Sequence, residues 1–162
     1  MIEPLHPDAV RHLVVHCSAT PDDAVTGVAD VHAMHLGFGW HGIGYHRVIA
    51  RDGTVHAGRP EYWIGAHVYG RNETSLGVCL LGTRRFTDAQ LDALEATVLE
   101  WRARYPNATV CGHRDFSTTD KTCPNFDVGA WCAWRGIDVG DGPVGDRPAG
   151  GREPGARSRV PA

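Results

Sequence analysis

Three common signals are missing from this sequence of 162 residues. No stretch approaches the roughly 18 consecutive apolar residues that a membrane-spanning helix needs. The N-terminus also lacks the basic start and apolar run of a secretory signal peptide. The net charge is only −3, which is too small to draw the chain to nucleic acid or to an anionic membrane. We therefore expect a cytoplasmic protein with no membrane insertion and no nucleic-acid partner.

The cysteines do not form an even set. There are five of them, and an odd number without a signal peptide argues against a framework of disulfides. Reduced thiols fit better, with one or more of them serving as metal ligands. The ten histidines are many for a chain of this length, so the sequence calls for a search for a metal site.

Short apolar runs alternate with helical patterns along the chain. A continuous apolar run predicts a buried strand at 11–17, and further strands are expected at 44–50, 75–82 and 108–112. The sequence RDGT at 51–54 predicts a hairpin turn. Helices are expected over about 27–36, capped by Thr26, after the capping box at 87–90, and around Trp131 and Trp134. This order predicts an α/β fold with a central mixed sheet flanked by helices.

The composition changes sharply near the C-terminus. After Gly136 the chain is dominated by Gly, Pro, Arg and Asp, with few large apolar side chains. Such a segment cannot bury enough apolar surface to fold. We therefore expect one domain over residues 8–137 and a disordered tail over 138–162.

Two histidines and one cysteine stand where a metal site could form. His16 and His113 each follow a predicted strand, and Cys123 lies ten positions after His113 in the same polar loop. Catalytic zinc uses three protein ligands and leaves a fourth position open, and imidazole and thiolate suit it well. The ligands are scattered, however, and His16 could instead be a half-buried histidine in a satisfied hydrogen bond. Spacing alone leaves both interpretations open.

The remaining thiols favour a packing role. Side chains alternate across a strand, so Cys17 should face the core if His16 faces a cleft. Cys79 lies in an apolar run and is typical of a small buried side chain. Cys111 is either another buried thiol or an alternate ligand beside His113.

A family resemblance runs through these segments in order. The chain resembles the N-acetylmuramoyl-L-alanine amidases of the bacteriophage T7 lysozyme type, which are relatives of the peptidoglycan recognition proteins. The matching elements are HCSAT at 16–20, GW at 39–40, IGYH at 43–46, RDGT at 51–54, AGR at 57–59, AH at 66–67, N at 72, SLGVCL at 75–80, GHRD at 112–115 and KTCP at 121–124. Two features depart from the family: the loop between His113 and Cys123 is slightly longer than in the phage T7 protein, and the tail has no counterpart.

The resemblance implies a complete catalytic site. One zinc ion would be held by His16, His113 and Cys123. Tyr45 would reach the attacking water or the substrate oxygen. Lys121 would stabilise the negative charge that develops on the substrate. All five residues are present, so nothing in the sequence marks an inactive relative.

The substrate implied by the resemblance is bacterial peptidoglycan, cut between N-acetylmuramic acid and L-alanine. His67 lies in a loop of glycines and aromatic residues, and we expect it to line a substrate groove together with Asn72. The protein would act as a monomeric phage endolysin, held in the host cytoplasm until it is released to the cell wall.

Two alternatives stand beside the enzyme. One is a module that binds peptidoglycan without cutting it, and the other is a regulator that binds and inhibits a polymerase. The presence of Cys123, Tyr45 and Lys121 favours the enzyme over the binding module. The sequence neither supports nor excludes the regulator.

Overall fold

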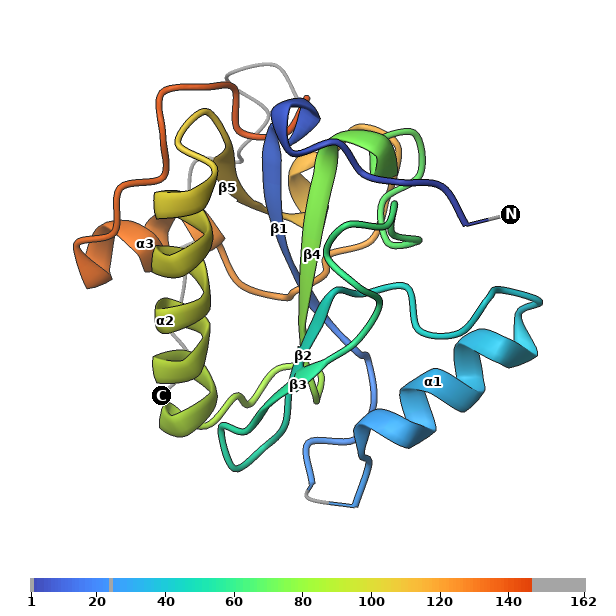
Figure 1. Cartoon of the computed structure of the whole chain (residues 1–162). Helices are drawn as coiled ribbons and strands as arrows, with labels where there is room; N and C mark the ends of the chain where they lie inside the picture. The colour runs from blue at the N-terminus through green and yellow to red at the C-terminus, as the bar shows by residue number, and fades with distance from the viewer. Residues whose placement is uncertain (1, 24, 147–162) are drawn as a thin grey trace.

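The computed structural model describes residues 2–23 and 25–146, which form three helices packed around one sheet (Figure 1). The strands are β1 (His12–Cys17), β2 (Arg47–Ile49), β3 (Val55–Ala57), β4 (Ser75–Leu80) and β5 (Thr109–Gly112). The α-helices are α1 (Val28–Gly37), α2 (Asp88–Arg104) and α3 (Val128–Arg135). Three short 3-10 helices are η1 (Pro7–Ala9), η2 (Asn72–Thr74) and η3 (His113–Asp115).

The strands form a mixed sheet in the order β3-β2-β4-β1-β5. β1 lies between β4 and β5 and is parallel to both. β2 is parallel to β4 and antiparallel to β3, with which it forms the hairpin that the RDGT sequence predicts. The predicted α/β fold with a mixed central sheet is therefore confirmed.

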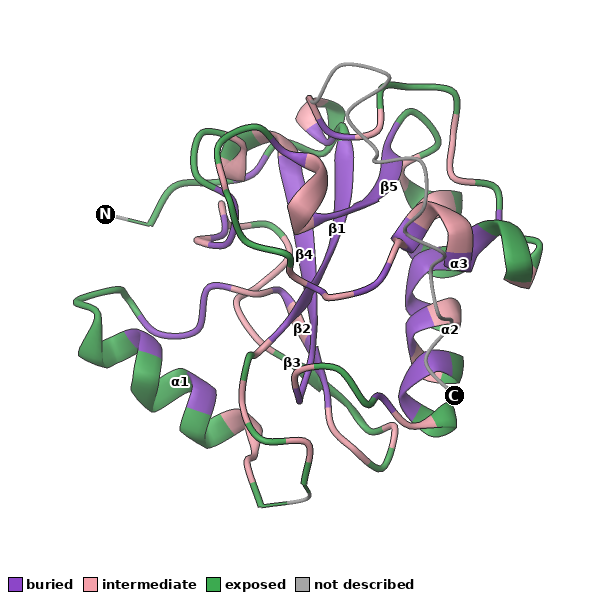
Figure 2. Ribbon diagram, turned by 180° about the vertical axis from the view of Figure 1, so that it is seen from behind, coloured by how far each residue is buried: buried purple, intermediate pink, exposed green. Residues whose placement is uncertain are grey.

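The sheet separates two unequal layers. α2 and α3 cover one face, while α1 and several long loops lie against the other (Figures 1 and 2). Leu13, Val15 and Cys17 of β1 belong to the large core beneath α2 and α3. Val14 points the opposite way, into a small cluster beneath the loops, and His16 shares its face. Cys17 thus faces the core, as the alternation along the strand predicts.

α2 is the helix that the capping box predicts. The Thr87 hydroxyl accepts a hydrogen bond from the Gln90 backbone N–H, and the Gln90 side chain accepts one from the Thr87 N–H, both at 3.1 Å. One stripe of the helix is buried, comprising Leu91, Leu94, Val98 and Trp101.

Among the described residues, no helix is long and apolar enough to cross a membrane.

α1 begins one residue later than the sequence suggests. Its N-cap is Gly27 rather than Thr26, because the Asp30 carboxylate accepts the Gly27 N–H at 2.8 Å and closes the first turn. The strand predicted over 44–50 is also shorter, and before its first residue the Gly44 N–H donates to the His35 ring. α1 therefore rests on the sheet through few buried side chains, and most of it is exposed (Figure 2).

Residues 138–146 stay on the domain although their composition resembles a tail. The Val110 N–H donates to the Val139 carbonyl at 2.9 Å, so this segment covers the outer edge of β5. Val144 packs against the cluster beneath the loops, and Asp146 forms an ion pair with Arg71 at 2.8 Å. The rest of the predicted tail, 147–162, lies outside the described residues.

Candidate metal centre

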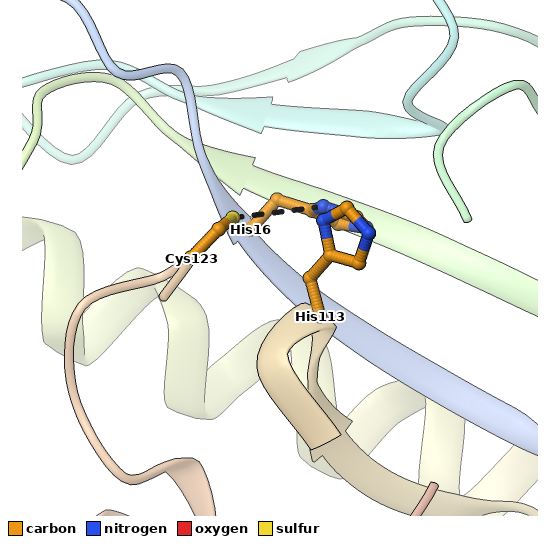
Figure 3. A group of neighbouring side chains, drawn as sticks. All are labelled: His16, His113 and Cys123. Atoms are coloured by element: carbon orange, nitrogen blue, oxygen red, sulfur yellow. Dashed lines mark hydrogen bonds between the residues drawn. The ribbon is translucent and has the colours of Figure 1, made fainter. Parts of the chain in front are cut away.

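The three predicted ligands meet at one edge of the sheet (Figure 3). His16 is near the carboxyl end of β1, and His113 directly follows β5. The two strands are parallel, so their carboxyl ends lie together and present both rings at the same edge. Cys123 reaches the same place from the loop between η3 and α3. Positions that are far apart in the sequence are thus joined by the parallel pairing.

The distances between these side chains suit a small metal ion. One ligand atom from each residue lies within 4.8 Å of the others. The Nδ1 atom of His16 is 3.8 Å from the Cys123 sulfur, and the two imidazole rings are 4.7 Å apart. Tetrahedral zinc, with bonds of about 2.0–2.3 Å, would place its ligand atoms roughly 3.3–3.6 Å from one another. Two imidazoles and one thiolate are a donor set that zinc favours, so the residues fit the ion.

Backbone hydrogen bonds hold the loop that carries Cys123. The Arg114 N–H donates to the Cys123 carbonyl at 2.8 Å, which ties the two ends of the loop together. The Cys17 N–H donates to the Cys123 sulfur at 3.2 Å. Asn125 donates its side-chain N–H to the Thr83 carbonyl at 2.8 Å. The thiol is therefore fixed against the end of β1.

Tyr45 and Lys121 lie beside this group. The Tyr45 ring is 5.0 Å from the His16 ring. Lys121 is exposed on the loop between His113 and Cys123, and its positive charge is close enough to affect both histidines. Both residues are therefore close to the three candidate ligands.

Comparison with known proteins shows where the chain belongs. Residues 6–126 match the family described as N-acetylmuramoyl-L-alanine amidase. The chain is a member of this amidase family.

Individual relatives of the chain are named as endolysins or amidases. The amidase is 42% identical over 125 residues to the endolysin of Enterobacteria phage K11, which covers 72% of this chain and 82% of that protein. It is 39% identical over 127 residues to the endolysin of Escherichia phage T7, covering 74% and 83% of the two chains. Among solved structures, an endolysin N-acetylmuramoyl-L-alanine amidase from Clostridium intestinale superposes with a TM-score of 0.72 at 26% identity, covering 85% of this chain and 90% of the other.

The environment of the amidase centre keeps both imidazoles neutral. Burial, followed by the nearby His67, lowers the pKa of His16 well below its usual range. Burial and then the Lys121 charge lower the pKa of His113 to about 4. A neutral ring keeps a lone pair for a metal. A hydrogen bond with the Cys17 thiol, followed by burial, raises the pKa of Cys123, so a cation would be needed to hold it as a thiolate.

Tyr45 is also uncharged. Burial, with a smaller effect from the neighbouring Cys79 and Cys123 thiols, raises the pKa of Tyr45 well above its usual range. At neutral pH the phenol is therefore a hydrogen-bond donor and not a base. This state suits contact with an oxygen that is gaining negative charge.

Of the two residues predicted to bind substrate, His67 is buried and Asn72 is partly buried. His67 is only 8% exposed, and its Nδ1 atom is 2.9 Å from the Nε2 atom of His16. It thus stands behind His16, on the side away from Cys123. The Asn72 side chain accepts the backbone N–H groups of His67 and Val68 at 2.8 and 2.9 Å. Asn72 therefore shapes the loop, and its amide oxygen is used within the protein.

Sequence reasoning missed several residues around the centre. Ser75 contacts the His67 ring, and Gly77 makes room for it. The strand alternation offered a signal for both, because residues 75 and 77 lie on the same face of a strand. The sequence alone does not show which strand lies next to residues 75–80. Only the observed pairing of β4 with β1 places Ser75 beside His12 and Gly77 beside Val14.

Proposed function

We propose that this amidase hydrolyses the amide bond between the lactyl group of N-acetylmuramic acid and L-alanine in peptidoglycan, with one zinc ion held by His16, His113 and Cys123. The observation that carries the proposal is the convergence of these three donors from two strand ends and a loop. The family match over residues 6–126 supports the same reaction.

Amide hydrolysis needs a strong nucleophile and stabilisation of the charge that develops on the carbonyl oxygen. Zinc, when bound, supplies Lewis acidity and activates water at neutral pH. The chain itself provides the other groups. The Lys121 ammonium offers a positive charge to the developing oxyanion, and the protonated Tyr45 phenol offers a hydrogen bond to it or orients the water.

The placement of the ligands supports catalysis rather than binding alone. His16 is fixed on a fully buried strand, and Cys123 is bound by backbone groups at the end of that strand. Three protein ligands leave a fourth position for water or substrate, which is the pattern of catalytic zinc sites. A binding module that does not cut would need neither the thiolate nor the adjacent lysine.

The biological role that we propose is that of a phage endolysin. The phage relatives that carry this name are about 40% identical over most of their length. The enzyme would act on the host cell wall at lysis, after release from the host cytoplasm.

The proposal is tested by removing one thiol at a time. Cys123→Ala should lose stoichiometric zinc and nearly all clearing of a peptidoglycan suspension, because only two ligands remain. Cys132→Ala is the matched control, since Cys132 is a buried residue of α3 and lies outside the ligand group. It should retain zinc and activity. Full zinc content and clearing in folded Cys123→Ala would refute the assigned site.

A further inference from the structure

A chain of side-chain hydrogen bonds runs away from the metal centre into the protein. The His16 Nε2 atom is 2.9 Å from His67 Nδ1, and His67 Nε2 is 3.3 Å from the Ser75 hydroxyl. The Ser75 hydroxyl lies 2.8 Å from the Arg71 carbonyl. Both rings and Ser75 are buried. The chain therefore ends on a backbone group and is closed to solvent.

The last link sets the direction of all the others. A carbonyl can only accept, so the single Ser75 hydroxyl proton is donated to Arg71. Ser75 must then accept from His67 Nε2–H. A neutral imidazole carries one proton, so Nδ1 of His67 is an acceptor. It follows that His16 carries its proton on Nε2 and donates it to His67.

This direction leaves the other nitrogen of His16 with a free lone pair. Nδ1 is the atom that faces Cys123, at 3.8 Å (Figure 3). Histidines that bind metals generally use their second nitrogen to bond a partner that fixes the tautomer and the ring orientation. Here the partner would be a second histidine, itself oriented by Ser75.

The surrounding backbone reserves space for the His67 ring. A Cβ atom at Gly77 would lie 2.7 Å from His67 Nδ1, and one at Gly65 would lie 2.6 Å from its Cδ2. Any side chain at either position would displace the ring. The Asn72 amide fixes the backbone of the same histidine. Three neighbours thus hold the ring where it meets His16.

We propose that His67 is a positioning residue that locks His16 in the Nε2–H tautomer and directs its Nδ1 atom to the metal. This inference rests on the proposed zinc site, and it assigns to His67 a task different from substrate contact. Ser75 acts through His67, because it fixes which nitrogen of His67 accepts.

The tautomer can be read without any metal. Long-range ¹H–¹⁵N NMR spectra of the full chain, labelled on histidine and treated with a chelator, distinguish a protonated Nε2 from a protonated Nδ1. We expect His16 to carry its proton on Nε2 before zinc is added. A protonated Nδ1, or an equal mixture of tautomers, would contradict the inference even if zinc binds normally.

Zinc affinity, measured by competition with a chromophoric chelator, supplies the second readout. His67→Phe keeps a ring but removes the acceptor, and it should weaken zinc binding about 10- to 100-fold. His67→Asn retains an acceptor near the Nδ1 position and should recover most of that loss. Ser75→Ala should allow the His67 tautomer to exchange and cost only a few-fold.

The outcomes separate the two proposals. If the wild-type chain binds no zinc, the proposed function fails, while the tautomer measurement still judges the inference. If folded His67→Phe and His67→Asn lose the same affinity, or neither loses any, the hydrogen bond is not what positions His16. Spectra of the folded amide region show whether each variant keeps its structure.

Discussion

The metal centre has a strand side and a loop side, and they are held in different ways. On the strand side, His16 of β1 and Ser75 of β4 are buried together with His67, which packs against them from a loop, and each nitrogen of His67 has a partner. On the loop side, His113 and Cys123 are half-buried and Lys121 is exposed. The strand side is packed against the sheet, whereas the loop side is held by a few hydrogen bonds, such as those to the Cys123 carbonyl and sulfur.

This difference suggests that the two sides have different tasks at the metal centre. The strand side sets the orientation of a ligand, which demands rigidity. The loop side completes the ligand set and brings a charge to the substrate, which demands access. Changes on the loop side should therefore alter the rate with little effect on folding, while changes on the strand side should alter stability.

The largest effect is expected at Lys121. Lys121→Ala should lower kcat by about 10²–10³, the usual loss when one group that stabilises an oxyanion is removed. Zinc content should stay at one per chain, because the ammonium is not a ligand. Turbidity assays with saturating peptidoglycan and metal analysis check the two parts.

The chain offers a sharp control for this prediction, since Lys121 is its only lysine. An amine-acylating reagent should inactivate the wild-type enzyme by removing that charge. The Lys121→Arg variant keeps a positive charge that the reagent does not attack, so its activity should survive. Loss of activity in both proteins would show that the reagent acts elsewhere.

A second effect concerns stability on the strand side. His46 neighbours His67; its Nδ1 atom accepts the Gly77 N–H, and its Nε2–H donates to the Trp63 carbonyl. Burial lowers the pKa of His46 to about 4 from 6.5. Between these values the unfolded chain binds a proton that the folded chain does not, so stability falls as the pH drops from 6.5 to 4. The loss is at most about 3 kcal/mol.

Urea unfolding across this pH range, with chelator present throughout, measures how the free energy of unfolding changes with pH. His46→Asn keeps an acceptor for Gly77 without a titrating ring, so its stability should depend less on pH. His56→Asn makes the same substitution at an exposed histidine of β3 and is the matched control. If the stability of His46→Asn depends on pH as steeply as that of the wild type, His46 does not cause this pH dependence.

The smallest effect is expected where the C-terminal segment holds the loop side. One Asp146 oxygen accepts the Ser117 N–H, and the other pairs with Arg71, so this carboxylate joins the loop of His113 to the loop of His67. Asp146→Ala should cost about 1 kcal/mol of stability, since the pair is partly exposed. Zinc should dissociate a few-fold faster.

The exposed Asp141 lies in the same segment and provides the comparison. Asp141→Ala should match the wild type in both thermal unfolding and the rate of zinc release to a chelator. If Asp146→Ala also matches the wild type, the loop side is held without the segment.

Local patterns were sufficient for much of the fold. The apolar run of β1, the capping box of α2 and the turn between β2 and β3 each depend on neighbouring residues, and each was predicted from the sequence. Residues 138–146 were assigned to a tail from their composition, because the contacts that hold them on the domain are with residues distant in the sequence. The hydrogen bond from Val110 to Val139 and the packing of Val144 have no local signature.

The candidate site, too, was predicted only in part. The sequence suggested His16, His113 and Cys123 because each residue type can bind zinc, and the family resemblance joined them. The position of His67 behind His16 was not predicted, because it depends on the bend of a loop and on the space left by Gly65 and Gly77, which have no side chain. From the sequence alone, a histidine in a glycine-rich loop is expected to be exposed, whereas the fold buries His67.

The most direct test of the central claim is mass spectrometry of the fragments released from purified peptidoglycan, with and without a zinc chelator. We predict stem peptides that begin with a free L-alanine amine and glycan strands that keep intact sugar linkages. Chelation should abolish both products, and added zinc should restore them. Fragments cut between sugars, or release that is insensitive to the chelator, would contradict the assignment of a zinc amidase.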